Sequence, residues 1–140
     1  TVDVNTLSLD TLAEQFGAPD LIRMDVEGHE VAVLRGFIDL LNKIHTKPTV
    51  IFETHLSRYN NNNDMRSLLL ELFQLGYAVT LAGSSWEAGT KIVEGLGYSS
   101  NVSVRSDGYV RKIFRDIKSE HAISLICDTG GLRTVVLQAN

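Results

Sequence analysis

The chain has 140 residues, of which 44% are hydrophobic and 21% charged, and its formal net charge is −4 at pH 7. This length suits one domain over residues 1–140, and the composition is typical of a globular protein. The mildly acidic balance argues against a nucleic-acid partner, because nucleic-acid-binding proteins usually carry a strongly basic face. No apolar stretch is long enough to cross a bilayer, so we expect no membrane partner.

The cysteine count and the first residues predict the compartment and the extent of the chain. Cys127 is the single cysteine. This excludes an internal disulfide and favours the reducing cytoplasm. The first residues do not resemble a signal peptide. Because the chain begins at Thr1 within a pattern typical of folded structure, we expect it to be a segment of a longer protein.

Hydrophobic periodicity predicts alternating strands and helices in the first half of the chain. Ser8 is placed to cap the first helix, and residues 17–19 (Gly-Ala-Pro) end it. The predicted elements cover residues 1–7 (strand), 9–16 (helix), 21–26 (strand), 29–44 (helix) and 49–52 (strand).

The second half continues this alternation, with one irregular segment. Asp64 and Ser119 are predicted helix caps, and residues 83–112 are predicted to be an irregular excursion with short strands. The regular elements cover residues 65–75 (helix), 77–81 (strand), 119–129 (helix) and 134–137 (strand). Alternation of this kind predicts a largely parallel sheet with helices on both faces. The expected fold class is a Rossmann-like, three-layer α/β architecture that lacks its N-terminal part.

Four candidate site residues follow two predicted strands. Asp25 and Glu27 end the apolar run 21–26, and Glu53 and His55 follow the strand 49–52. Neighbouring parallel strands lie about 4.8 Å apart and end at the same edge of the sheet, where ligands bind in open α/β folds. We therefore expect these four side chains to share one rim, with Asp25 and Glu27 on the same side by strand alternation.

Other interpretations of these residues stay open. Asp25 or Glu27 could simply cap the helix that follows, since carboxylates stabilise helix N-termini. Glu30 reads as an acid of the first helical turn, and His55 as a loop residue held by a hydrogen bond. Gly28 allows either the close approach of a ligand or a turn with positive φ.

Residues 20–36 (DLIRMDVEGHEVAVLRG), with Ser8-Leu9-Asp10 before them and Val50-Ile-Phe-Glu53 after them, resemble the FkbM-type family of S-adenosylmethionine-dependent methyltransferases. The positions that match the family's core are Asp25, Val26, Glu27, Gly28, Glu30, Leu34, Arg35 and Gly36. The resemblance covers about residues 7–55. It implies a class I methyltransferase fold, in which residues 21–26 form the fourth strand and residues 50–52 the fifth.

The resemblance also implies a cofactor and roles for the site residues. Asp25 and Glu27 would face the sulfonium of S-adenosylmethionine and the methyl acceptor, with Asp25 and Gly28 at the cofactor. His55 or Glu53 would be the catalytic base. The reaction it suggests is O-methylation of a small-molecule or sugar hydroxyl.

The chain departs from the complete family pattern in one respect. The glycine-rich loop after the first strand, and the acid that holds the ribose, have no counterpart before residue 20. Residues 92–97 (IVEGLG) resemble such a loop only loosely, and a turn in the excursion explains them better. We therefore expect methyl transfer from the full-length parent, and little cofactor pocket in this segment alone.

Two further classes of function are compatible with the sequence. The same four residues, Asp25, Glu27, Glu53 and His55, could serve a metal-dependent hydrolase. Their spacing matches no diagnostic motif, so no metal ligand is assigned. Alternatively, the chain could be a non-catalytic half-domain that pairs with a partner chain or forms a homo-oligomer through an exposed sheet edge. Residues 83–112, with Trp86, Tyr98, Arg105 and Tyr109, could form either a substrate cover or a structural flap.

Overall fold

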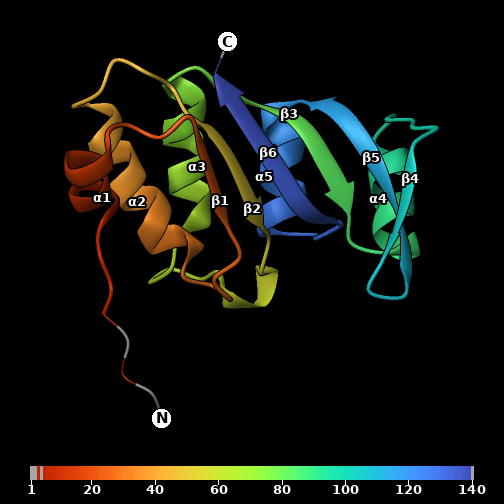
Figure 1. The fold of residues 1–140 in the computed structure, drawn as a ribbon. Coiled ribbons are helices and arrows are strands. Elements are labelled where there is room, and N and C mark those ends of the chain that lie inside the picture. Colours follow the sequence, from red (N-terminus) through yellow and green to blue (C-terminus); the bar gives the residue numbers. More distant parts are fainter. Residues whose placement is uncertain (1–2, 4, 140) are drawn as a thin grey trace.

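The computed structural model describes residue 3 and residues 5–139, which form a six-stranded sheet lined by helices (Figure 1). In chain order, the elements are α1 (Leu9–Phe16), β1 (Leu21–Met24), α2 (Glu30–Leu41), β2 (Thr49–Glu53), the 3-10 helix η1 (Leu56–Arg58), α3 (Met65–Gln74), β3 (Tyr77–Ser84), α4 (Glu87–Gly95), β4 (Ser103–Ser106), β5 (Tyr109–Ile117), α5 (Ser119–Cys127) and β6 (Leu132–Ala139). Their order across the sheet is β1-β2-β6-β3-β5-β4.

The sheet is mixed, which corrects the prediction of a largely parallel one. Among the described strands, only β1 and β2 pair in parallel, and each of the other neighbouring pairs is antiparallel. The β2–α3–β3 segment does carry the chain between two strands of the same direction, as the alternation predicted. However, β6 lies between them and runs opposite to both. The α/β class is confirmed, and its parallel part is confined to the β1–β2 pair.

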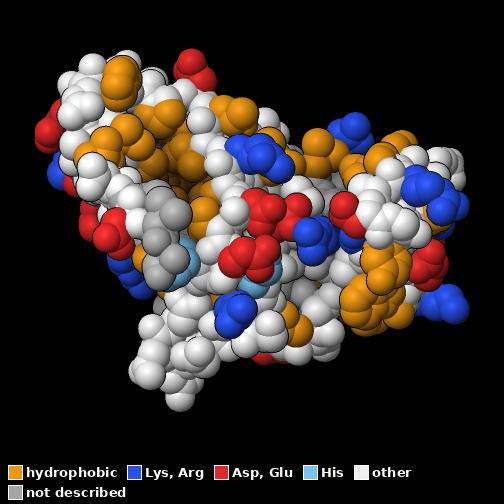
Figure 2. Space-filling view, turned by 60° about the horizontal axis from the view of Figure 1, so that its bottom comes forward, with side chains coloured by type: hydrophobic (Ala, Val, Ile, Leu, Met, Phe, Trp, Pro, Cys, Tyr) orange, Lys and Arg blue, Asp and Glu red, His pale blue; other side chains and the backbone are white. Residues whose placement is uncertain are grey.

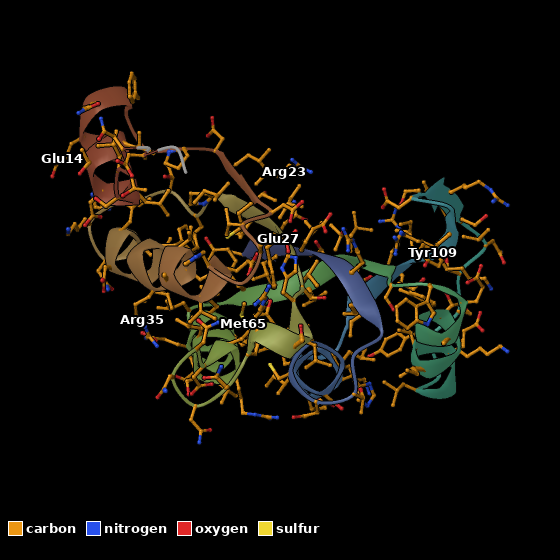
Figure 3. The ribbon with its side chains drawn as sticks, turned by 90° about the horizontal axis from the view of Figure 1, so that it is seen from below. Glu14, Arg23, Glu27, Arg35, Met65 and Tyr109 are labelled. Atoms are coloured by element: carbon orange, nitrogen blue, oxygen red, sulfur yellow. The ribbon has the colours of Figure 1, made fainter. Side chains whose placement is uncertain are left out.

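The helices lie on one face of the sheet, so the described residues form two layers and not three. Figure 3 shows α2, α3, α4 and α5 on the same side, with α1 beside α2 beyond the β1 edge. On this side the strands bury Val50, Phe52 and Leu137 completely. On the opposite face, Ile51 and Val136 stay partly exposed, because no helix of the described part covers them.

Several predicted helix ends agree with the structure, and two do not. Ser8 accepts a hydrogen bond from Thr11 N, and Asp64 accepts one from Ser67 N, as their capping positions predict. Ser119 was expected to be a cap, but it is the first residue of α5, and the residue before it makes no side-chain cap bond. Helix α2 ends at Leu41, short of the predicted residue 44.

Residues 83–112 are more regular than predicted. They contain the helix α4 and the β4–β5 hairpin, which extends the sheet beyond β3. Residues 92–95 of the glycine-containing run lie within α4, which excludes a strand followed by a glycine loop there. The strand predicted over residues 1–7 falls partly outside the described residues, and residues 3 and 5–7 are not in a strand. Within the described part of the chain, no helix has the length and apolar character that a membrane span requires.

Substitution of Phe37 tests how much the hydrophobic core beneath the sheet contributes to the free energy of unfolding. Its side chain is fully buried and meets the Tyr77 ring edge-on, with the ring centroids 5.8 Å apart. We expect Phe37→Ala to lower the free energy of unfolding by about 3–5 kcal/mol, measured by chemical denaturation. Phe16→Ala is the matched control, because 80% of Phe16 is exposed and its loss should change stability little. Equal effects of the two variants would contradict this core.

Because of Tyr77, we expect the free energy of unfolding to change with pH in the alkaline range. Its hydroxyl donates to Pro48 O at 3.0 Å, and burial raises the pKa of Tyr77 from 10.0 to about 12. The folded state therefore holds this proton more tightly than the unfolded state. Its contribution is complete below pH 10.0 and is lost as the pH rises towards about 12.

We expect the free energy of unfolding to fall less steeply over this pH range in Tyr77→Phe than in the wild type. The measurement is denaturant unfolding at a series of alkaline pH values. Tyr109→Phe is the control, because Tyr109 is 46% exposed. A profile of Tyr77→Phe that is parallel to the wild type would refute the assignment.

Candidate functional site

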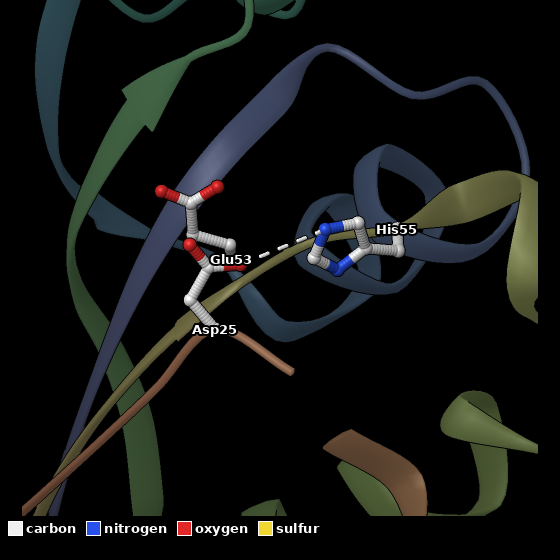
Figure 4. A group of neighbouring side chains, drawn as sticks. All are labelled: Asp25, Glu53 and His55. Carbon is white, nitrogen blue, oxygen red and sulfur yellow. Dashed lines mark ion pairs between the residues drawn. The ribbon is translucent and has the colours of Figure 1, made fainter. Parts of the chain in front are cut away.

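The parallel pairing of β1 and β2 sets two carboxylates side by side. Met24 pairs with Phe52 in register, so Asp25 and Glu53 occupy the next position at the same end of the sheet. Figure 4 shows both carboxylates at these strand ends, with the His55 ring facing Asp25. The shared rim predicted from the sequence is therefore present in the structure. The catalytic roles of these residues stay predictions.

His55 is the centre of this cluster. Its Nε2 lies 3.8 Å from Asp25 Oδ1 and 3.6 Å from Glu27 Oε2, and its Nδ1 lies 3.0 Å from Glu30 Oε1. Only 13% of its side chain is exposed. Three carboxylates thus surround one imidazole. A protonated imidazole can pair with these carboxylates, and a neutral one can accept a proton from a ligand.

Asp25 and Glu27 come together for a different reason from the predicted one. Strand β1 ends at Met24, so strand alternation does not govern Glu27. Instead, Glu27 has a left-handed backbone with φ 53°, and this turn brings its carboxylate to His55. The capping interpretation is wrong for the described residues, because His29 is the N-cap of α2 and no side-chain cap bond forms there.

Glu30 is the residue that the sequence interpretation missed. It is the first residue of α2, as a first-turn acid should be, but its side chain is completely buried. Its Oε1 accepts a hydrogen bond from Val26 N at 3.1 Å, and its Oε2 has no hydrogen-bond partner among the described residues. The glutamate of the family core at this position was the available signal.

A basic residue from the antiparallel neighbour completes the cluster. Arg133 of β6 lies with its Nη2 2.6 Å from Glu53 Oε2, and the Glu53 side chain is only 17% exposed. This partner could not be predicted, because the insertion of β6 beside β2 was not expected. Figure 2 shows the result as red acidic side chains gathered around a pale-blue histidine, next to a blue basic group.

The backbone of His55 is held from the other side by Tyr59. His55 N donates to the Tyr59 hydroxyl oxygen at 3.0 Å, across the short helix η1. Burial raises the pKa of Tyr59 well above its ordinary value of 10.0, so this hydroxyl stays protonated even in mildly alkaline solution. The backbone of His55 is therefore held by a hydrogen bond, whereas its ring lies among carboxylates and its Nδ1 has no hydrogen-bond partner among the described residues.

A cleft of about 710 Å³ opens beside the free edge of β1 and reaches Asp25. Its lining is mostly apolar and comes from three segments: Leu7, Ser8, Leu9, Ile22, Arg23, Met24, Asp25, Val26, Ala32, Val33 and Gly36. Figure 2 shows orange side chains in a hollow next to the red cluster. Asp25 thus belongs to both the cleft and the histidine cluster.

Tyr109 and Trp86 of the excursion lie at the other end of the sheet from this site. Tyr109 begins β5, and β2, β6 and β3 lie between β5 and β1. Figure 3 shows Tyr109 far from Glu27. Trp86 packs instead against Tyr109, with ring centroids 6.3 Å apart. Both the structural flap and the substrate cover stay untested predictions.

Comparison with known proteins gives one match. Residues 1–79, more than half of the chain, match the family model described as the methyltransferase FkbM domain. No curated protein and no solved structure shows significant similarity to the chain. The matched segment contains Asp25, Glu27, Gly28, Glu53 and His55.

Gly28 illustrates how the local backbone supports the site. Its φ is 103°, and a Cβ there would lie 2.7 Å from Arg58 Cγ. Of the two sequence interpretations, the turn with positive φ is therefore present, and cofactor binding by Gly28 stays a prediction. We expect Gly28→Ala to destabilise the fold by more than the ~1–2 kcal/mol of a left-handed backbone alone.

Gly17→Ala is the matched control for this variant. Gly17 also has a positive φ, of 87°, but no atom lies within 4 Å of the position that its Cβ would take. Thermal unfolding of both variants measures the difference. Gly28→Ala should have the lower melting temperature, and a reversed order would show that Arg58 does not restrict this position.

Proposed function

The chain belongs to the FkbM methyltransferase family, and we propose that its cluster and cleft catalyse methyl transfer from S-adenosylmethionine to a hydroxyl group. The observation that carries this proposal is the position of Asp25. Its carboxylate is part of the cleft beside β1 and also faces His55 Nε2 at 3.8 Å. A cofactor in the cleft and a hydroxyl at the cluster would therefore meet at one residue.

The described residues fit the reactive end of the cofactor. When bound, S-adenosylmethionine supplies an electrophilic methyl group, which leaves the sulfur as a bond to the acceptor oxygen forms. The apolar lining, with Met24 and Val33, can exclude water from this end, and Asp25 offers a negative charge to the sulfonium. We name Asp25 and Gly28 as the cofactor-binding residues, as the resemblance implied.

The cluster supplies the functions that an acceptor hydroxyl needs. Asp25 and Glu27 can orient the hydroxyl, which is the main contribution of an enzyme to a displacement reaction. The proton that the hydroxyl loses passes to a base, for which His55 Nε2 and Glu53 are the candidates. Glu30 and Tyr59 act on His55 and are positioning residues, because they contact its ring and its backbone.

The remaining parts of the proposal concern the acceptor, the compartment and self-association. We propose a small molecule or a sugar as the acceptor, and the cytoplasm as the compartment on the ground of the single cysteine.

Burial raises the pKa of the Cys127 thiol to about 11, so this thiol is protonated at neutral pH and is a poor nucleophile. We also propose self-association through the exposed edge of β1, where Leu21 is 53% exposed; because this edge borders the cleft, such pairing would be an alternative to cofactor binding there.

The test is methyl transfer by the full-length gene product, measured with cofactor carrying a labelled methyl group and a panel of hydroxylated small molecules and sugars. We expect Asp25→Asn to lower the rate about 100-fold, because misplaced reactants lose rate on this scale. Asp20→Asn is the matched control, since it changes the same charge at the opposite, exposed end of β1. Unchanged turnover in Asp25→Asn would remove this residue from the mechanism.

A further inference from the structure

We propose that Asp25, Glu53 and His55 form a binding site for one divalent cation. Each of these residues offers a ligand atom, and the three atoms lie within 4.8 Å of one another (Figure 4). Two carboxylates and one imidazole suit Mn²⁺ in particular, because this ion accepts oxygen ligands and also tolerates nitrogen. The three residues come from the ends of β1 and β2.

The charge balance of the cluster favours a cation. Four carboxylates meet there, those of Asp25, Glu27, Glu30 and Glu53. Arg133 pairs with Glu53 through Oε2, which leaves the other oxygen of that carboxylate for a ligand. The remaining three carboxylates depend on His55 alone among the described ion pairs. Glu30 is completely buried, whereas the side chains of Asp25 and Glu27 are 36% and 78% exposed. A divalent cation beside His55 would add positive charge to a cluster in which carboxylates outnumber their cationic partners.

Glu30 gives an independent reason to expect a metal at His55. Its side chain is completely buried, its Oε2 lacks a hydrogen-bond partner in the described structure, and its Oε1 lies 3.0 Å from His55 Nδ1. Histidines that bind metals usually present their second nitrogen to a carboxylate, which fixes the tautomer and the ring orientation. In the described structure this contact is close but not aligned as a hydrogen bond, since His55 Nδ1 has no hydrogen-bond partner. A turn of the ring on cation binding would let Glu30 hold the proton on Nδ1, and Nε2 would then bind the cation on the side of Asp25.

The cation site would also define how the acceptor is activated, a consequence that rests on the proposed methyl transfer. A cation bound to Asp25, Glu53 and His55 can take the acceptor oxygen as a further ligand and lower the pKa of its hydroxyl. His55 Nε2 is then a ligand and no longer a base. The proton would pass to Glu27, whose side chain is 78% exposed and lies beside the same nitrogen.

The experiment is a titration of the metal-free full-length gene product with Mn²⁺ at neutral pH, followed by electron paramagnetic resonance of the free ion. It is performed without cofactor or acceptor. We expect one saturable site per chain. Asp25→Asn and Glu53→Gln should each weaken binding at least ten-fold, and Asp20→Asn should leave it unchanged. Mg²⁺ and Zn²⁺ are added as competitors to define the class of metal.

Glu30→Gln tests the positioning role. The amide keeps the size of the side chain and an oxygen that accepts from Val26 N, so the fold should persist. We expect its Mn²⁺ affinity to fall about 10–100-fold, as for other residues that orient a metal ligand. Melting curves recorded without metal verify that each variant is folded. A Glu30→Gln variant that unfolds is replaced by His55→Gln, which removes the nitrogen ligand itself.

Two outcomes would overturn the site. One is the absence of saturable Mn²⁺ binding, and the other is binding that Asp25→Asn, Glu53→Gln and Asp20→Asn affect equally. The two proposals fail separately, since binding is measured without any reaction. Methyl transfer by a protein that binds no cation refutes the cation site only, and cation binding by a protein without methyl transfer refutes the proposed function only.

Discussion

The pairing of β1 with β2 is the constraint on which the site depends. It is the one parallel pair among the described strands, and it makes two strand ends coincide at the same edge of the sheet. Asp25 and Glu53 lie close together because of this register. A shift of one residue would turn their side chains to the opposite face, so the hydrophobic pattern that fixes the register also fixes the chemistry.

The buried glutamate at the start of α2 links this strand geometry to the helix layer. Glu30 occupies a position where an ordinary first-turn acid would point to solvent, yet it is enclosed between the β1–α2 turn and His55. A buried carboxylate is costly unless it is paired, and Glu30 has its partners in the backbone of the turn and in the nearby imidazole. Its contacts with Val26 N and His55 join the turn to the imidazole.

The sequence allowed the local elements and the rim to be predicted, because both depend on short-range patterns. Apolar spacing located α1 and β2, and the common end of two parallel strands placed Asp25 near Glu53. The position of β6 could not be predicted in this way, since its pairing with β2 and β3 joins segments that are far apart in the chain. Arg133 was missed for that reason.

Helix α4 and the burial of Glu30 were missed for other reasons. Residues 87–95 contain two glycines and a threonine, which weaken the helical signal, and the packing of α4 against β3 and β5 stabilises it nonetheless. The burial of Glu30 depends on the turn at Glu27 and Gly28. A pattern of apolar residues does not report such a turn, because its geometry is set by two left-handed residues in succession.

Because of that turn, the backbone strain at Glu27 opposes the contact of its carboxylate with His55. A glutamate with φ 53° is strained in a way that glycine or asparagine would not be, so replacing it should relieve the backbone while removing a carboxylate from His55. Selection for a more thermostable protein would therefore tend to discard this side chain, whereas selection for turnover would retain it. If Glu27 acts as proposed, the strained residue beside Gly28 marks where a gain in stability would come at the expense of the reaction.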